Sequence, residues 1–272
     1  MTAAQLFAEG QLAAAIQQQS QAVRAAPSDP NPRIFLLGLL VLAGELSRAT
    51  THADLLMTTA ATDQGLSLGM LAYQACLRAE CERAAIYEGK ATPLFPAEAP
   101  SALGHRLAAL QAAAGGDFAA ARAELERATS SEELVQATVN GGERAPLADG
   151  DDFLGCTLEV YASGRCVWLP MSQVAGLEIH PPKMLLDLVW ARARLQPKDG
   201  EPADVHLPVL YAGSAAHADE AVRLGRRTEW TDVEGVGLRG CGQKVFLHGA
   251  GGSATSDVAI LEAREIEVAR EP

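Results

Sequence analysis

The residues with the most evident catalytic potential form a Gly-x-Ser-x-Gly pattern, Gly65-Leu-Ser-Leu-Gly69. In hydrolases this pattern holds a nucleophilic serine on a strained turn between a β-strand and a helix, and a histidine elsewhere in the chain acts as its base. Here the flanking residues on both sides predict helices rather than a strand. We therefore expect Gly65 to end one helix and Ser67 to cap the next. A serine hydrolase that uses Ser67 stays as an alternative hypothesis.

A second candidate is the segment His248-Gly-Ala-Gly-Gly-Ser253, which resembles a glycine-rich loop for an oxyanion or a phosphate. No Gly-Lys-Ser/Thr follows it, and no alternation of strands and helices surrounds it, as a nucleotide site requires. An esterase-type loop would precede its serine in the chain, whereas this segment comes after Ser67. We predict a hairpin loop here.

Residues that could hold a metal ion are scattered. Cys76 and Cys81 are five positions apart, so they do not lie above one another on a helix, and the six histidines show no zinc-ligand spacing. The turn Asp149-Gly-Asp-Asp lacks the alternating ligands and the final glutamate of a calcium loop, and we predict that it is solvated. No metal and no cofactor are expected. The alternative left open is a cluster formed in space by Cys156, Cys166, Cys241 and His248.

The composition is that of an acidic protein, with 34 Asp and Glu against 22 Lys and Arg and a net charge of −12. Such a charge repels phosphate backbones and anionic lipid, so we expect neither nucleic acid nor a membrane as a partner. The first residues lack the basic segment of a signal peptide. The five cysteines are an odd number and widely spaced, which is typical of reduced thiols in a cytoplasmic protein.

The elements that carry these residues differ between the two halves of the chain. The pattern Gly, polar, Leu or Phe, two variable residues, Ala recurs at Gly10, Gly44 and Gly116. The first interval, 44 − 10 = 34, matches the period of tetratricopeptide helix pairs, and the second, 116 − 44 = 72, is about twice that. Residues 78–84 are expected to hold a degenerate third copy. We predict a peptide-binding helical repeat, with a plain helical bundle as the alternative. The predicted helices are residues 3–8, 11–25, 31–43, 45–61, 66–88, 101–114 and 117–129.

After residue 131 the alanine-rich periodicity gives way to short strands and tight turns, which predict a small, mainly antiparallel barrel or twisted sheet. The fold class is therefore α+β in two parts, a helical domain of residues 1–131 and a β-rich domain of residues 132–272. Trp168, Trp190 and Trp230 are expected in its core, and Arg192 and Arg194 on one strand face beside carboxylates. The predicted strands are residues 135–139, 157–169 with a turn at 162–165, 177–179, 189–196, 203–211, 228–231, 243–248 and 257–268, and the predicted short helices are residues 183–188 and 217–224.

Several ordered motifs fill residues 132–268: DGDDFLG-x-x-LEV, GR-x-x-WLP, LEI-x-PPK-x-L-x-DL-x-W-x-x-ARL, V-x-LPVLY-x-GS, LG-x-x-TEW and G-x-GQKVFL. In these motifs the chain resembles the ImpE/TagJ family, also called SciE-type, of type VI secretion accessory proteins. The resemblance implies a cytoplasmic bacterial protein with a tetratricopeptide-like part and an α+β part. It also implies contact with the small sheath subunit TssB of the contractile sheath and, in some systems, with the recycling ATPase ClpV. It implies no enzymatic activity, and no motif transfers a protein-binding residue or an oligomeric state to this chain.

Overall fold

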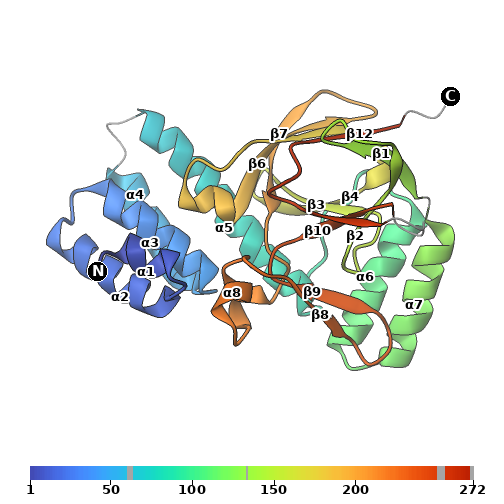
Figure 1. Cartoon of the computed structure of the whole chain (residues 1–272), viewed down its shortest axis with the longest axis horizontal. Coiled ribbons are helices and arrows are strands. Elements are labelled where there is room, and N and C mark those ends of the chain that lie inside the picture. Colours follow the sequence, from blue (N-terminus) through green and yellow to red (C-terminus); the bar gives the residue numbers. More distant parts are fainter. Residues whose placement is uncertain (60–63, 133, 250–254, 270–272) are drawn as a thin grey trace.

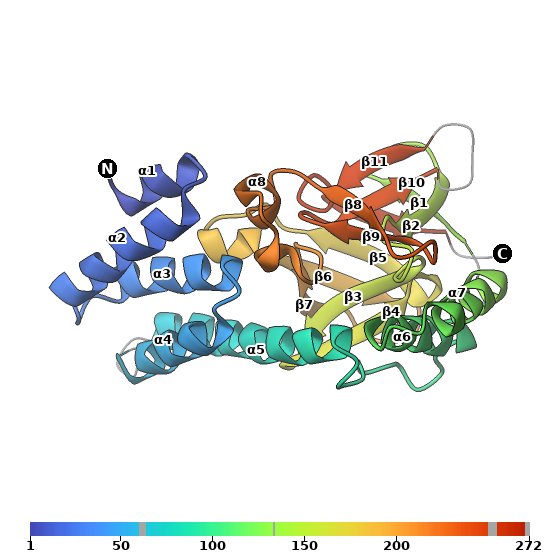
Figure 2. The same cartoon turned by 90° about the horizontal axis from the view of Figure 1, so that it is seen from below.

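One long helix, α5 (Gln64–Tyr87), runs through the molecule and joins its two ends. The computed structural model describes residues 1–59, 64–132, 134–249 and 255–269. The first part of α5 packs against the N-terminal helices, and its last turns pack against the strands β3 and β4 of a curled sheet (Figures 1 and 2). The hairpin of α6 and α7 lies beside the sheet at the other end. Helices followed by an antiparallel sheet confirm the predicted two-part α+β organisation.

The seven helices before the sheet agree with their predicted limits to within two residues over the described chain. The expected end of the helix at residues 45–61 falls partly on residues 60–61, which lie outside the described residues. Local signals account for this agreement, since apolar spacing, helix caps and turn glycines all act within a few residues. The helices are α1 (Ala3–Ala8), α2 (Leu12–Ala25), α3 (Pro30–Leu42), α4 (Leu46–Thr59), α5, α6 (Ser101–Ala114) and α7 (Phe118–Ser131).

The recurring glycines do end helices. Gly10, Gly44 and Gly116 have φ angles of 83°, 73° and 80°, which side chains other than glycine rarely adopt. In each turn the N–H groups of the glycine and of the next residue donate to carbonyls of the last helical turn. The expected copy at residues 78–84 is wrong, because these residues lie inside α5 without a turn. The next turn of this kind comes only at Gly89, with φ 73°.

The described residues form a sheet of ten strands in the order β11-β10-β2-β1-β12-β5-β6-β7-β3-β4. Every neighbouring pair is antiparallel, as predicted. A separate ribbon pairs β8 with β9. The strands are β1 (Val135–Val139), β2 (Ala145–Asp149), β3 (Thr157–Ala162), β4 (Arg165–Pro170), β5 (Val174–Ile179), β6 (Trp190–Pro197), β7 (Ala203–Pro208), β8 (Glu229–Asp232), β9 (Leu238–Cys241), β10 (Val245–His248), β11 (Ser256–Ala259) and β12 (Glu265–Val268).

Several predicted elements of this half need correction. Strands β2 and β9 were not predicted, and the strand expected at residues 257–268 is two strands separated by a turn. The strand expected at 203–211 ends at Pro208, where the chain enters the loop that leads to the 3-10 turn η4 (Ser214–Ala216). The short helix after the Pro-Pro pair is the 3-10 turn η3 (Leu185–Leu188), and the second is α8 (Glu220–Arg223). Apolar alternation persists through a turn, so periodicity alone does not locate such breaks.

One cluster of buried apolar side chains extends from the N-terminal helices to the last strand. Trp168 and Trp190 are fully buried in it, which confirms two of the three expected core tryptophans. Trp230 is 37% exposed and packs edge-on against Tyr211, so its assignment to the core is wrong. Because the cluster continues through both parts, a division into two domains at residues 131 and 132 stays a prediction.

Candidate functional site

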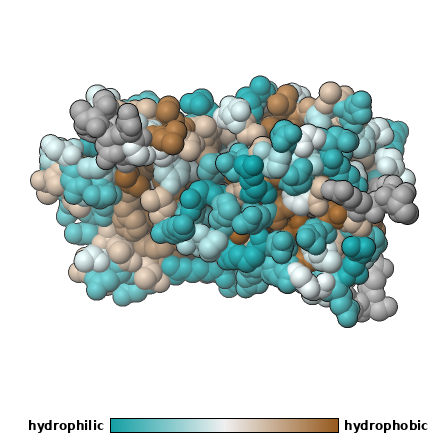
Figure 3. Space-filling model, turned by 90° about the horizontal axis from the view of Figure 1, so that it is seen from above, coloured by the Kyte–Doolittle hydropathy of each residue, from teal (hydrophilic) through white to brown (hydrophobic). Residues whose placement is uncertain are grey.

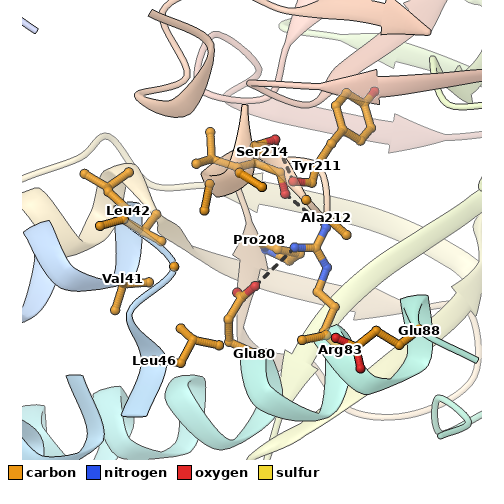
Figure 4. Close-up of a pocket in the computed structure, with 18 residues that line it drawn as sticks. Val41, Leu42, Leu46, Glu80, Arg83, Glu88, Pro208, Tyr211, Ala212 and Ser214 are labelled. Carbon is orange, nitrogen blue, oxygen red and sulfur yellow. Dashed lines mark hydrogen bonds and ion pairs between the residues drawn. The ribbon is translucent and has the colours of Figure 1, made fainter. Parts of the chain in front are cut away.

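One place where a ligand or a protein could dock lies between elements of the two parts of the chain. On the face shown in Figure 3, hydrophilic residues predominate at the centre and hydrophobic residues gather in separate areas toward the two ends. A cavity of about 410 Å³ lies instead where the α3–α4 turn, the second half of α5 and the loop after β7 meet (Figure 4). Its volume falls in the range of ligand pockets, about 300–1,000 Å³. We call it the central groove, and its lining includes Leu42, Leu46, Glu80, Arg83, Pro208 and Ser214.

Glycines allow the two walls of the central groove to approach each other. A Cβ atom on Gly44, in the α3–α4 turn, would lie 2.9 Å from the Cβ of Ala215 in the opposite loop. Gly213, with φ 90°, directly precedes the turn η4 that contains Ala215. The Ser214 hydroxyl donates to the Tyr211 carbonyl at 2.7 Å and accepts the N–H of Gly242 at 2.7 Å. This buried hydroxyl therefore fixes the loop against the segment between β9 and β10.

The far side of α3 is held in a similar way by the segment after the Pro-Pro pair. A Cβ on Gly38 would lie 2.9 Å from a methyl group of Leu185 in η3, so α3 contacts η3 closely. The buried Asp187 carboxylate accepts the N–H groups of Lys183 at 2.7 Å and Met184 at 3.2 Å. These bonds fix the loop before η3 and thereby place Leu185 against the helix.

Glu80 provides the acidic group of the groove. One of its oxygens, Oε2, accepts the hydroxyl of Tyr161 at 2.6 Å and the indole N–H of Trp190 at 3.0 Å. The other, Oε1, lies 3.4 Å from the Arg83 guanidinium. Both side chains project from α5 toward the loop of residues 208–214, as Figure 4 shows. The Glu80 side chain is 20% exposed, so its carboxylate can meet a ligand in the groove.

Behind the groove lies a buried charge cluster of Arg83, Glu159, Lys244 and Asp149. Arg83 Nε is 2.8 Å and Lys244 Nζ is 3.1 Å from the same oxygen of Glu159, and Lys244 Nζ is also 3.7 Å from Asp149. Two cations thus face two carboxylates, which is the condition under which charges are tolerated away from water. The cluster connects α5 with β2, β3 and the segment that leads into β10.

The two carboxylates of this cluster differ in acidity. Burial alone would raise the pKa of Glu159, but the charges of Arg83 and Lys244 outweigh it and hold the pKa at about 2. Burial raises the pKa of Asp149 to about 6, and Lys244 only partly opposes this. Asp149 also accepts the hydroxyl of Tyr211 at 2.8 Å and the N–H of Asp151 at 2.9 Å. Its oxygens are therefore engaged in holding the fold together.

The acidic turn that contains Asp149 is mostly buried, and the prediction of a solvated turn is wrong. Asp149 and Asp151 are 6% and 1% exposed, and only Asp152 of the three faces solvent. Asp151 accepts the N–H groups of Phe153 at 2.9 Å and Gly240 at 3.2 Å. The carboxylates turn inward because they accept backbone N–H groups of the turn itself and of β9 that would otherwise be buried without partners.

The Gly-x-Ser-x-Gly pattern lies within a helix. Gly65 and Ser67 both belong to the first turns of α5, which begins at Gln64, so the prediction that they separate two helices is wrong. The described element before them is the helix α4, which ends at Thr59. A nucleophile elbow requires a strand at this place. In the part of the chain that the structure describes, the serine hydrolase hypothesis therefore lacks its structural basis.

The other candidate ligands are also separated from one another. All five cysteines are free thiols, and within the described ranges no group of three or more His, Cys, Asp or Glu side chains could hold a metal ion. On α5, Cys76 is buried and Cys81 is exposed. Burial raises the pKa of Cys76 and of Cys166, which keeps both as thiols.

The remaining predicted residues lie on the sheet. Arg192 and Arg194 pair with Asp187 at 3.3 Å and Asp204 at 2.9 Å, which confirms the expected carboxylate partners. His248 pairs across the sheet with Ser256, so antiparallel strands flank the predicted glycine-rich hairpin, whose residues 250–254 lie outside the described residues. Among the described helices, none is sufficiently long and apolar to cross a membrane.

Known proteins resemble this chain over most of its length. The family model described as ImpE protein matches residues 141–267. The type VI secretion system accessory component TagJ of Pseudomonas aeruginosa is 34% identical over 262 residues, which cover 96% of this chain and 91% of the relative. This chain belongs to the ImpE/TagJ family. A Vibrio parahaemolyticus protein known from a crystal structure shares the fold, with a TM-score of 0.87 at 21% identity over 99% of this chain and 98% of the other.

The ImpE/TagJ motifs converge on the central groove and the cluster behind it. The motif V-x-LPVLY-x-GS supplies Pro208 and Ser214 to the groove, and G-x-GQKVFL supplies Lys244 to the cluster. Sequence reasoning missed Glu159 because its neighbours alternate as in a half-exposed strand. Both faces of β3 are in fact buried, since α5 packs against it. The sequence did contain a signal for the buried cluster: each of these motifs holds one charged residue among apolar ones, Glu159 in LEV and Lys244 in GQKVFL.

Proposed function

We propose that this protein is a non-enzymatic accessory protein of a bacterial type VI secretion system that acts in the cytoplasm by binding other proteins. The small sheath subunit TssB is the first candidate partner, and the recycling ATPase ClpV is the second. The observation that carries the proposal is the 34% identity, over 96% of the chain, to a protein named as an accessory component of such a system.

The geometry supports a binding role. The central groove offers a cavity of about 410 Å³ with apolar walls and the partly exposed carboxylates of Glu80 and Glu88, features that suit a segment of another protein. The charged groups behind it are engaged with one another and with backbone atoms, as a structural cluster requires.

We further propose that α1–α4 are two tetratricopeptide-like pairs within a helical domain of residues 1–131. Consecutive helices from α1 to α4 pack on each other, and the turns at Gly10 and Gly44 are 34 positions apart, since 44 − 10 = 34. A plain helical bundle would share the packing but would not require the two turns to be equivalent.

The test is a binding assay with the purified chain against folded TssB and against the folded N-terminal domain of ClpV from the same bacterium. We expect saturable binding to TssB, measured by isothermal titration calorimetry, with a defined stoichiometry. The absence of binding to either partner would overturn the proposal. A purely structural scaffold would associate with the assembled sheath but would show no saturable site for a segment of the isolated subunit.

A further inference from the structure

We infer that the central groove receives an apolar side chain of the partner protein together with a neighbouring lysine or arginine, whose cation pairs with Glu80. This inference rests on the proposed function, because it names the place on this chain where the partner segment docks and the chemistry of that segment.

The apolar part of the inference follows from the walls. Leu42 and Leu46 come from the α3–α4 turn, and Pro208 and Leu210 come from the loop on the other side (Figure 4). Leu42 and Leu210 are buried, at 2% and 9% exposure, so these walls are part of the packed core and do not need to form on binding. A preformed apolar recess favours a side chain of matching chemistry, since little ordering accompanies binding.

The cationic part follows from the charges at the base of the groove. In the buried charge cluster, Arg83 and Lys244 balance Glu159 and Asp149. Glu80 is a third carboxylate beside these two cations. Its two short contacts, the Tyr161 hydroxyl and the Trp190 indole, are neutral donors and do not balance its charge. The base of the groove therefore carries a net negative charge, which attracts a cation.

The hydrogen bonds of Glu80 leave room for this cation. Oε2 already accepts two short bonds, whereas Oε1 has one contact of 3.4 Å with Arg83 in the described structure, long for a charged pair. A carboxylate oxygen has two lone pairs, so Oε1 can accept a further donor from the partner.

A second carboxylate extends the negative charge toward the mouth of the groove. Glu88, the first residue after α5, also lines the groove, and its side chain is 58% exposed. Lys90 pairs with it at the surface, where such pairs contribute little. In a helical partner segment, the apolar residue and the cation would lie three or four positions apart, on one face.

The first test uses a probe that does not depend on the identity of the partner. Two acetylated and amidated alanine-rich helical peptides are titrated into the isotopically labelled full chain and followed by NMR. One peptide carries a leucine and a lysine four positions apart, and the other carries a leucine and a glutamate. We expect the leucine–lysine peptide to shift the amide signals of Gly44, Gly213 and Ala216 in a saturable manner. Shifts elsewhere, or equal shifts with the glutamate peptide, would overturn the inference.

The second test measures the affinity of folded TssB for four variants. Ala216→Trp places a ring at the exposed rim of the groove, and Glu80→Gln removes the charge but keeps an oxygen that accepts from Tyr161 and Trp190. Their matched controls, Ala119→Trp and Glu126→Gln, change exposed residues on α7. We expect at least tenfold weaker binding for each groove variant and unchanged binding for the controls, with all four folded by circular dichroism.

The outcomes separate the two proposals. If wild-type chain binds TssB and both groove variants bind as well as the controls, the groove inference is wrong and the proposed function stands. If TssB does not bind while the leucine–lysine peptide occupies the groove, the proposed partner is wrong and the groove inference stands.

Discussion

The guanidinium of Arg83 on α5 donates to the carboxylate of Glu159 on β3 at 2.8 Å, and neither side chain is more than 3% exposed. The same guanidinium donates to the carbonyl of Leu210 at 3.0 Å, in the loop that lines the central groove. One side chain of the helical part therefore reaches the core of the sheet and the wall of the groove. The two parts of the chain are tied together by buried charge as well as by apolar packing.

Replacing Arg83 by methionine should destabilise the fold strongly. The change leaves Glu159 with Lys244 as its remaining cationic partner and leaves the Leu210 carbonyl without this donor. Removing one member of a buried ion pair typically costs about 3–5 kcal/mol. We expect a loss of this size in the free energy of unfolding, measured by urea denaturation.

The matched control is Arg48→Met, because Arg48 pairs with Glu45 on the surface and its side chain is 52% exposed. Exposed pairs contribute about 0–1 kcal/mol. Equal urea midpoints for the two variants would contradict the role given to Arg83.

Stability should depend on pH through Asp149. The folded chain holds the Asp149 proton more tightly than the unfolded chain, because burial raises its pKa from 3.8 to about 6. Its contribution to stability is therefore greatest below pH 3.8 and is lost as the pH rises through 6. From the shift, the loss is about 3 kcal/mol. Asp149→Asn removes this titration. Between pH 4 and 6 the unfolding free energy of the wild type should therefore fall relative to that of the variant.

Glu159 should act in the opposite sense and at lower pH. Its pKa falls from 4.5 to about 2 on folding, so its contribution is present above pH 4.5 and is lost as the pH falls through 2. Urea titrations at a series of pH values, for wild type and Asp149→Asn, check both effects. A constant difference between the two chains from pH 4 to 7 would show that Asp149 does not titrate as described.

Two adjacent glycines provide an internal test of the helix-ending turns. Gly116 has φ 80° and open space where a Cβ would lie, so Gly116→Ala changes the backbone energy alone. We expect a cost of about 1–2 kcal/mol. Gly115 has a helical φ of −82°, and its Cβ would meet two carbonyl oxygens at 3.5 Å, an ordinary contact. Gly115→Ala should therefore change stability by less than about 0.5 kcal/mol, and a larger cost than for Gly116→Ala would contradict this account.

The cysteine thiols should react more slowly the more deeply they are buried. Cys81 is exposed, whereas Cys76, Cys156 and Cys166 are buried. We expect a thiol-specific disulfide reagent to modify Cys81 first in the folded chain and the three buried thiols only on unfolding. Burial and the nearby Glu80 raise the pKa of Cys81, so its reaction should accelerate as the pH rises. Cys81→Ser should remove the fast phase, and persistence of that phase would assign it to another cysteine.

The sequence by itself determined the helices and many of the turns. Gly10, Gly44 and Gly116 end helices because the required φ is a property of one residue and its hydrogen bonds stay within one turn. The hairpin at residues 157–170 and the antiparallel character of the sheet also follow from local alternation and tight turns. The motifs in the second half were sufficient to indicate the ImpE/TagJ family.

Only the tertiary structure decided which polar side chains are buried. Asp149 was expected in solvent and Glu159 was not singled out, yet both lie in the core beside Lys244. Their burial depends on what covers them, and α5 comes from a part of the chain more than 70 residues away, since 159 − 83 = 76. The alternation of apolar residues predicts which side chains share a face of a strand, but it does not predict which element packs on that face.

The central groove also could not be predicted from local sequence patterns. Its walls come mainly from residues 41–46, 80–88 and 208–216, three segments that carry no common motif and meet only when the helices pack on the sheet. Local sequence determines the shape of each segment, because turn glycines and caps act over a few residues. Their meeting depends on apolar burial and on the Arg83–Glu159 pair, which are long-range terms that no short window of sequence contains.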